Sequence, residues 1–375
     1  MAPAPGEERA DAAALRPSIR AVAALAGVSP TTVSHALSGT RSVSAATRER
    51  VLRAAAELGY TPNRLASGLR MRRTGVIGLA SDRIATTPFA GRIVQGAQEA
   101  AWEREVVLMV VDSEGDPGLE EAQLRALLDH RVDGIVLARM SHQEVARPAA
   151  LGATPAVLVD GVPADGWRVP AIAPDEEGIA ATAVAHLVAA GHRRIGFVTT
   201  TEDAPASRGR EAGFWAALVA AGLAGPAGRD RPDSSSAAVE RAASDAAGGR
   251  LAGRRLLDRP AAERPTAVFC FNDQMAMGVY QAASALGLDV PRDCSIVGVD
   301  DLDIVAAALE PGLTTIALPH REMGRWGMTT LPDRIDGSPG IDGRDGDAAT
   351  DAAEPVLLAC ELVERGSVAP PAAAG

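Results

Sequence analysis

The chain has 375 residues, of which 47% are hydrophobic, and a formal net charge of −11. This length allows two or three domains with buried cores, and the composition excludes a disordered or fibrous protein. No run approaches the roughly 20 apolar residues of a membrane span, and the first 18 residues lack the basic and apolar segments of an export signal. We therefore expect a soluble, cytoplasmic protein with a disordered Ala/Pro-rich leader at residues 1–16.

The charge is distributed unevenly along the chain. Residues 1–73 contain 11 arginines and 5 acidic residues, so this stretch has a net charge of +6 and the remainder a net charge of −17. A basic head on an acidic body indicates a polyanionic partner for the head alone, since phosphate would repel the body.

Residues 17–61 are predicted to form a helix-turn-helix domain. Ser18 can cap a first helix, and Gly27 stands where a left-handed residue would end it. Ser29 can then cap a second helix that has Pro30 at its first position, where a missing N–H does no harm. The spacing of a small residue, a turn glycine and an apolar anchor is that of a helix-turn-helix, and a third helix follows it.

The exposed side of the second helix is predicted to contact DNA. With Val33, Ala36 and Leu37 facing inward, small hydroxyl side chains face outward. Such side chains let a helix approach DNA closely and bond phosphates or base edges. The residues predicted to contact DNA here are Ser29, Pro30, Thr31, Thr32, Ser34 and His35.

Residues 62–73, which follow the third helix, are predicted to form a hinge helix only when bound. Gly68 alone costs about 1 kcal/mol of helix stability relative to alanine, and the segment is too short to form a stable helix in water by itself. We expect it to be disordered when free and ordered between DNA and a partner chain.

The stretch "SIRAVAALAGVSPTTVSHALSG", with the continuation to "TPNRLASGLR", resembles the head of the lactose-repressor (LacI/GalR) family of bacterial transcription regulators. In that family the second helix enters the major groove, and the hinge helices of two subunits pair in the minor groove. Many members have arginine where this chain has His35, so the base read there stays open. The resemblance implies hinge contacts to DNA from Asn63, Arg64, Ala66 and Leu69, with Leu69 as a wedge between base pairs.

Past Thr74, short apolar runs alternate with amphipathic helical segments, which predicts an α/β core with doubly wound parallel sheets. Ligands bind such sheets beyond the carboxyl ends of the strands. Polar residues follow nearly every predicted strand, among them Asp82, Arg139, Asp160, Asn272 and Asp300. Each one can equally cap the next helix, but their number favours a hydroxyl-rich ligand.

No enzyme motif accompanies these strands. Neither G-x-G-x-x-G nor a phosphate loop follows a predicted strand, and no nucleophile elbow with a matching base is found. The three cysteines are widely spaced in apolar runs, which favours buried thiols over disulfides, and no ligand set for zinc is present. We expect no catalytic role, no cofactor and no metal site.

Later segments, including "HLVAAGHRRIGFVT" and "PTAVFCFNDQMAMGVY", resemble the effector-binding core of the same family. That core has two similar subdomains around a cleft, as in periplasmic sugar-binding proteins. The resemblance places the core at residues 74–375, with one subdomain at about 74–173 and 317–335 and the other at about 174–316 and 354–370. The implied effector contacts are Asp82, Phe89, Asp160, Asp175, Arg210, Asn272 and Asp300.

Two of these assignments have a plain structural alternative. Arg210, the implied clamp for hydroxyls or an anion, could be an exposed helix arginine, and Phe89, the implied stacking face, could be a core residue.

These observations predict a DNA-binding transcription regulator, a repressor by analogy, that acts as a homodimer on a pseudopalindromic operator. A small hydroxylated ligand, first of all a sugar, would control it from the cleft, and whether that ligand releases or promotes DNA binding stays open. The chain lacks a terminal heptad run of leucines, which favours a dimer over a tetramer. The alternative is a solute-binding protein of a sugar transporter, against which the helix-turn-helix counts.

Overall fold

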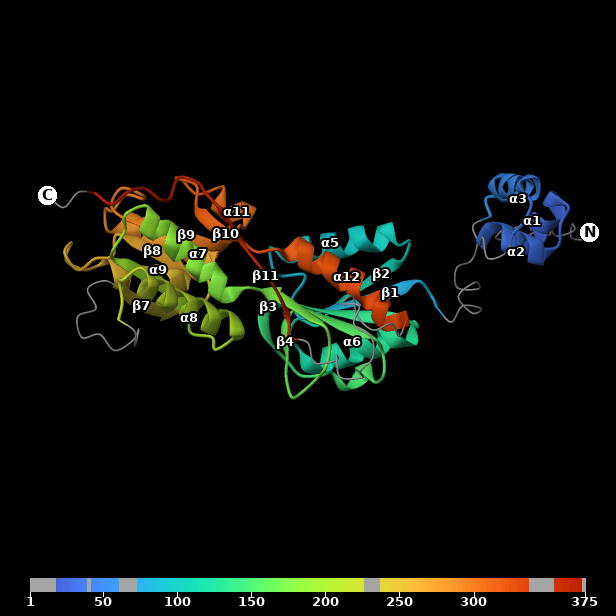
Figure 1. The fold of residues 1–375 in the computed structure, drawn as a ribbon, viewed down its shortest axis with the longest axis horizontal. Coiled ribbons are helices and arrows are strands. Elements are labelled where there is room, and N and C mark those ends of the chain that lie inside the picture. Colours follow the sequence, from blue (N-terminus) through green and yellow to red (C-terminus); the bar gives the residue numbers. More distant parts are fainter. Residues whose placement is uncertain (1–17, 39–41, 61–72, 226–236, 337–353, 373–375) are drawn as a thin grey trace, which may run out of the picture. The chain divides into compact units, whose positions relative to one another are not determined.

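The computed structural model describes residues 18–38, 42–60, 73–225, 237–336 and 354–372. The chain divides into two compact units, a helical unit within residues 1–74 and a core within residues 75–375 (Figure 1). The predicted leader at residues 1–16 and nearly all of the predicted hinge, residues 62–72, lie outside the described residues.

The helical unit contains three short helices, α1 (Ile19–Ala26), α2 (Pro30–Ser38) and α3 (Ala45–Glu57). The Ser18 hydroxyl accepts a hydrogen bond from the amide of Ala21, and Gly27 ends α1 with a φ of 65°. These local features agree with the predicted cap and turn. The small core of this unit consists of Val22, Ala23, Ala26, Val33, Ala36, Val51, Ala54 and Ala55.

The first sheet of the core is parallel throughout and has the strand order β11-β5-β4-β3-β1-β2. Its strands are β1 (Val76–Ser81), β2 (Val107–Asp112), β3 (Gly134–Val145), β4 (Ala156–Pro163), β5 (Ala171–Pro174) and β11 (Val356–Leu358). Helices α5 (Ala90–Glu103) and α12 (His320–Asp336) cover one face, and α6 (Pro117–Asp129) with the 3-10 turn η1 (Ala149–Leu151) packs on the other. Long apolar runs form these strands because helices cover both faces.

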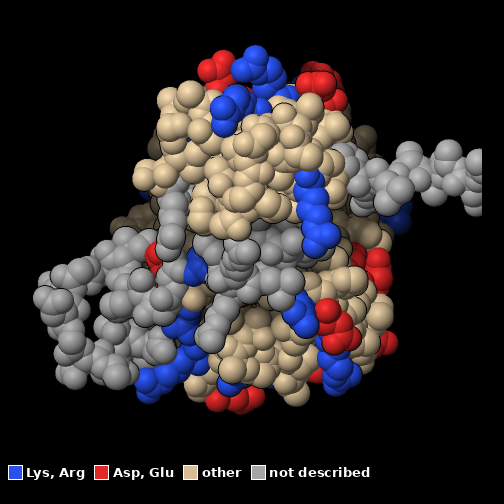
Figure 2. Space-filling view, turned by 90° about the vertical axis from the view of Figure 1, so that its right-hand side faces the viewer, with Lys and Arg blue, Asp and Glu red and all other residues tan. Residues whose placement is uncertain are grey.

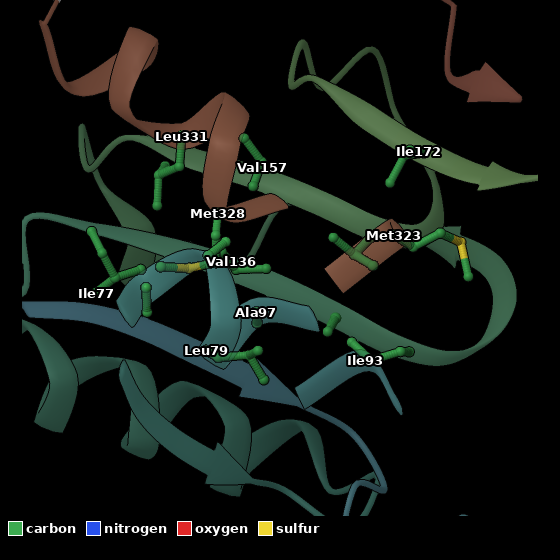
Figure 3. Packing of buried hydrophobic residues seen from close by; sticks show 14 of the residues in the cluster. Ile77, Leu79, Ile93, Ala97, Val136, Val157, Ile172, Met323, Met328 and Leu331 are labelled. Atoms are coloured by element: carbon green, nitrogen blue, oxygen red, sulfur yellow. The ribbon is translucent and has the colours of Figure 1, made fainter. Parts of the chain in front are cut away.

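The face under α5 and α12 is closely packed (Figure 3). Gly96 and Gly324 allow the two helices to approach, since a Cβ on either would lie about 2 Å from a carbonyl oxygen of the other helix. The labelled residues of this cluster are Ile77, Leu79, Ile93, Ala97, Val136, Val157, Ile172, Met323, Met328 and Leu331. This packing fixes the start of α12, which borders the cleft described below.

The second sheet has the corresponding order β12-β10-β9-β8-β6-β7, with β12 antiparallel to β10. Its strands are β6 (Ile195–Thr200), β7 (Ala237–Ala242), β8 (Ala267–Cys270), β9 (Ser295–Asp300), β10 (Thr314–Ala317) and β12 (Glu361–Val363). Helices α7 (Glu176–Ala189) and α8 (Pro205–Ala220) pack on one face. The other face is covered by α9 (Ala246–Leu257) and α10 (Asp273–Ala285), and a short helix, α11 (Asp303–Ala306), follows β9.

The chain passes between the two sheets three times, after β5, after β10 and between β11 and β12. The last passage corrects the predicted subdomain boundary, which gave all of residues 354–370 to the second subdomain. Strand β11 pairs with β5 of the first sheet, and only β12 onward joins the second. The run "VLLACELV" has no internal signal for this division, because the pairing of two three-residue edge strands depends on neighbours far away in the chain.

No helix among the described residues is long and apolar enough to cross a membrane.

Candidate DNA interface and ligand cleft

Helix α2 has its apolar side chains buried and its polar ones at the surface. Val33 and Ala36 are buried, whereas Pro30 and Thr31 are exposed. Thr32, Ser34 and His35 are partly exposed on the same helix. The first turn of α2 contains no acidic residue that would repel phosphate. The side chains predicted to contact DNA on this helix are therefore accessible.

Ser29 has a structural role besides any contact to DNA. Its hydroxyl accepts a hydrogen bond from the amide of Thr32 at 3.1 Å and lies 2.9 Å from the Thr32 hydroxyl. This is an N-terminal cap of α2. Asn63, Arg64, Ala66 and Leu69, the predicted hinge contacts, lie outside the described residues.

The charge of the three helices is modest. The described residues between positions 18 and 60 include four arginines and two glutamates. On the face of the molecule in Figure 2, arginine and acidic side chains lie in small interspersed groups among other residues. The described residues of the three-helix unit therefore carry a net charge of only +2, compared with +6 for residues 1–73 as a whole.

In the core, a cleft of about 1190 Å³ is lined by residues at the carboxyl ends of strands from both sheets. This is the position at which parallel α/β sheets bind ligands. Six of the seven predicted effector contacts line it: Asp82, Phe89, Asp160, Arg210, Asn272 and Asp300.

Asp175, the seventh, does not line the cleft, and the structure corrects that expectation. Its carboxylate accepts a hydrogen bond from the amide of Gly178 at 3.0 Å and caps α7. The next residue, Glu176, is the one that lines the cleft. The Asp175 carboxylate is thus held at the start of its own helix by the capping hydrogen bond. Glu176, the next residue, is the acid at the cleft.

Glu176 forms a buried ionic cluster with Arg210 and His142. The Arg210 Nε donates to Glu176 Oε2 at 2.7 Å, and His142 Nδ1 lies 3.2 Å from Glu176 Oε1. Burial would raise the pKa of Glu176, but Arg210 and His142 outweigh it, so the pKa is lowered. Burial would likewise lower the pKa of Arg210, and the Glu176 and Asp300 carboxylates outweigh it, so that pKa is raised.

The guanidinium of Arg210 is largely occupied by the protein itself. Its Nη1 donates to the carbonyl oxygen of Phe271, and its central carbon lies 4.4 Å from the centre of the Phe271 ring. Arg210 is 4% exposed, so it is not the exposed helix arginine considered as the alternative. Glu176, the ionic partner of Arg210, could not be predicted from the sequence pattern, because 34 residues separate the two.

Two further predicted contacts support the cleft wall through internal hydrogen bonds. Asp82 accepts from the amide of Met140 at 3.0 Å and from the side chain of Gln143 at 2.7 Å. Asn272 caps α10 by accepting from the amide of Met275 at 2.7 Å and donates to the carbonyl of Ser244 at 3.0 Å. Both residues position neighbouring groups whether or not they also touch a ligand.

Asp160 and Asp300 are buried carboxyl groups on opposite walls of the cleft. Both have left-handed backbone conformations, with φ of 57° and 114°, which non-glycine residues adopt mainly where surrounding structure enforces them. Burial raises the pKa of each carboxyl well above its ordinary value, and neighbouring carboxylates raise it further. The Asp160 Oδ1 is buried without a hydrogen-bond partner among the described residues.

Phe89 stacks on His320, with ring centroids 4.3 Å apart and planes 9° from parallel. His320 is 1% exposed, and neither ring nitrogen has a hydrogen-bond partner among the described residues. Burial, with the nearby charges of Arg92 and Arg210, lowers the pKa of His320 to about 3, so its imidazole is neutral near pH 7. The sequence pattern alone does not single out His320, although an imidazole at the first position of α12, in "LPHREMG", is an available signal.

Comparisons with known proteins identify the family. Residues 18–63 match the model for bacterial regulatory proteins of the lacI family, and residues 184–368 match that for a periplasmic binding protein-like domain. The ribose operon repressor of Escherichia coli is 35% identical over 85% of this chain and 93% of its own length. The transcriptional repressor PurR of Aliivibrio salmonicida is 33% identical over 85% of this chain and 92% of its own length.

The chain belongs to the lacI family of bacterial regulatory proteins. This LacI-family protein combines a DNA-binding helix-turn-helix unit with a periplasmic-binding-protein-like core, as the sequence predicts. Its named relatives are transcriptional repressors, and they do not favour the alternative of a transporter's solute-binding protein.

Solved structures of the same fold also resemble this LacI-family chain. The lac repressor dimer bound to operator and an anti-inducer has a TM-score of 0.72 at 27% identity, covering 94% of this chain and 99% of that one. The regulator CelR in complex with cellobiose has a TM-score of 0.61 at 32% identity, covering 94% of this chain and all of that one.

Proposed function

We propose that this protein represses transcription in the cytoplasm as a homodimer that binds a pseudopalindromic operator and is controlled by a small hydroxylated ligand, first of all a sugar. The observation that carries the proposal is the combination of an accessible helix, α2, with a cleft whose buried polar groups include some without a hydrogen-bond partner in the described part of the chain. Buried polar groups without partners are costly, so a ligand that satisfies them binds favourably. The names of the ribose operon repressor and of the CelR–cellobiose complex support a sugar.

A homodimer is supported by exposed apolar side chains on the first subdomain. Strand β2 lies at the edge of its sheet, and its residues Val107 and Val110 are exposed. Trp102, at the end of α5, is 82% exposed. An uncovered edge strand with apolar neighbours favours association with a second chain. A dimer would also supply the two recognition helices that a pseudopalindromic operator requires.

The cleft provides a way to couple ligand and operator. Ion pairs join the two subdomains: Arg208 and Glu144, which line the cleft, are 2.6 Å apart, and Arg92 lies 2.9 Å from Asp303. A ligand that contacts both walls would favour one relative position of the subdomains. Through the predicted hinge at residues 62–73, about 1 to 3 kcal/mol of coupling would change operator occupancy several-fold or more.

Deletion of residues 1–73 tests the DNA-binding role. Operator sequences are first selected from random DNA with the full chain, and affinities are then measured by fluorescence anisotropy. We expect the truncated core to lose specific DNA binding while retaining ligand binding, as followed by thermal shift. Specific binding by the truncated core would overturn the proposal.

A finer test uses point variants. His35→Ala should weaken binding to the selected operator, whereas His130→Ala, at an exposed position of the core, should leave it unchanged. Leu69→Ala tests the predicted wedge, and it should reduce both affinity and the bend angle of the DNA. An unchanged bend angle would contradict that role for Leu69.

A further inference from the structure

His35 is the single ionisable residue of α2. The helix has the sequence "PTTVSHALS", which contains no acid, lysine or arginine, so its side chains are uncharged unless the imidazole is protonated. His35 is also the only side chain of residues 1–73 whose type changes charge between about pH 5 and 8, because this stretch has no other histidine and no cysteine. The charge that α2 presents to a polyanion therefore depends on this one group.

The His35 side chain is accessible to DNA. It lies in the last turn of α2, is partly exposed, and follows Thr31 and Thr32 by four and three residues, so the three side chains lie on one side of the helix. Among the described residues, the histidine rings that form hydrogen bonds or ion pairs all belong to the core: His142, His186 and His192. The ring nitrogens of His35 can therefore donate to an acceptor on DNA.

The charge around α2 is net positive in the described part of the helical unit. Helices α1 and α3 pack against α2, and Tyr60 follows α3. The charged residues of these helices are all exposed: Arg20, Arg48, Glu49, Arg50, Arg53 and Glu57. A further cation gains nothing from a net positive surface, whereas the phosphates of DNA favour it. An imidazolium on α2 is therefore more favourable beside DNA than in the free chain.

We propose that operator binding is coupled to protonation of His35: each subunit takes up a proton from the solvent at this ring when it binds, and the imidazolium donates a hydrogen bond to DNA. The acceptor is a phosphate oxygen or the N7 or O6 atom of a guanine. The inference rests on the proposed function and adds to it a dependence of operator affinity on pH. Because the bound state holds more protons, the affinity rises as the pH falls.

The first test measures operator affinity of the full-length protein at pH 6, 7 and 8. The operator is the sequence selected from random DNA, and fluorescence anisotropy is recorded at constant salt, since phosphate contacts depend on salt. One proton per subunit changes the affinity of a dimer by up to about 100-fold per pH unit. We expect the affinity to fall by about tenfold or more from pH 6 to pH 8. A constant affinity over this range overturns the proposal.

Variants of the full chain assign the pH dependence to His35. His35→Gln keeps a hydrogen-bonding side chain that cannot become charged, and His35→Arg is charged at every pH, so both should remove the dependence. His130→Gln, at an exposed histidine of the core, is the matched control and should keep the dependence of the wild type. A dependence that persists in His35→Gln would belong to another group and would overturn the assignment.

Calorimetry in two buffers of different ionisation enthalpy counts the protons taken up on binding at pH 7. We expect uptake of at most one proton per subunit by the wild type and none by His35→Gln. Uptake with the operator but not with a scrambled duplex of equal length assigns the contact to a guanine. Uptake with both duplexes assigns it to a phosphate oxygen.

Failure of this inference differs from failure of the proposed function. Specific operator binding without proton uptake would refute the inference and leave the DNA-binding role standing. A wild-type chain that selects no sequence from random DNA would refute the proposed function itself.

Discussion

On α2, polar side chains such as Thr31 and His35 stand at the surface of a unit of three short helices, whereas in the core Arg210, Glu176 and His320 are almost completely buried. A surface hydroxyl can exchange water for DNA without disturbing its helix. A buried charge depends on its partner, so a change to one member also affects the stability of the whole core. The comparison predicts that a change to a surface side chain of α2 alters DNA binding with little effect on stability, whereas a change to a buried charge of the core alters stability as well.

The largest expected effect tests that link at Glu176. Glu176→Gln leaves Arg210 buried without its carboxylate, which should lower the free energy of unfolding by about 3–5 kcal/mol. Urea unfolding followed by tryptophan fluorescence measures it, because all four tryptophans lie within residues 75–375 and report on the core alone. The control is Glu144→Gln, at the exposed pair with Arg208, which should change nothing measurable. Equal losses in both variants would show that burial does not distinguish the two pairs.

The next effect breaks the helical unit instead. Val33 is fully buried beneath α2, and Val33→Ala should cost about 2 kcal/mol by removing two buried methyl groups. In a unit of this size such a loss is a large share of the stability. Operator affinity should fall, while unfolding of the core, followed by tryptophan fluorescence, stays unchanged. Leu52→Ala, at a half-exposed position of α3, is the control, and a shifted core transition in Val33→Ala would contradict independent unfolding of the two units.

The core's buried acids should also make its stability depend on pH. Burial raises the pKa of Asp273 to about 7, and it raises those of Asp160 and Asp300 as well. In the unfolded chain these groups titrate near pH 4, so between about pH 4 and 7 the native state binds more protons. Stability is therefore highest at the acidic end of that range and falls as pH rises, by up to about 1.4 kcal/mol per pH unit for each group.

Urea unfolding between pH 5 and pH 8 measures this fall, and Asp273→Asn should reduce its slope. The helical unit supplies the contrast, because the glutamates among its described residues, Glu49 and Glu57, are exposed. An unchanged slope in Asp273→Asn would show that Asp273 does not contribute to it.

The helical unit depends on local contacts and the core on contacts between distant residues. This difference explains which features the sequence predicts well. The caps at Ser18 and Ser29 and the turn at Gly27 involve partners within a few residues, so local pattern is sufficient. In the core, the alternation of strands and helices predicts the sheets, and the strand ends predict where polar groups gather. Which of those groups are engaged internally depends on partners such as Phe271, which is 61 residues from Arg210.

Three differences between the sequence-based expectations and the structure arise because the deciding contacts join residues far apart in the chain. Asp175 and Glu176 are adjacent acids, and only the structure shows that the first caps a helix and the second pairs with Arg210. His320 becomes notable only because Phe89, more than 200 residues earlier, stacks on it. The division of the last segment between two sheets depends on the pairing of β11 with β5.

The smallest expected effect sharpens the comparison within the helical unit, where Ser29 is both a cap and a predicted DNA contact. Ser29→Ala removes the cap of α2 and should cost about 1 kcal/mol. Ser44→Ala removes the corresponding cap of α3, whose hydroxyl accepts from the amide of Thr47 at 3.3 Å, and should cost about the same. Stability of the helical unit is measured by hydrogen exchange, and operator affinity by fluorescence anisotropy.

If Ser29 acts only as a cap, the two variants should lose equal operator affinity. If its hydroxyl also contacts DNA, Ser29→Ala should lose more affinity than Ser44→Ala at the same stability. We expect the larger loss, because Ser29 lies exposed beside Pro30 and Thr31 at the start of α2. Equal losses would remove Ser29 from the predicted interface and leave its role entirely structural.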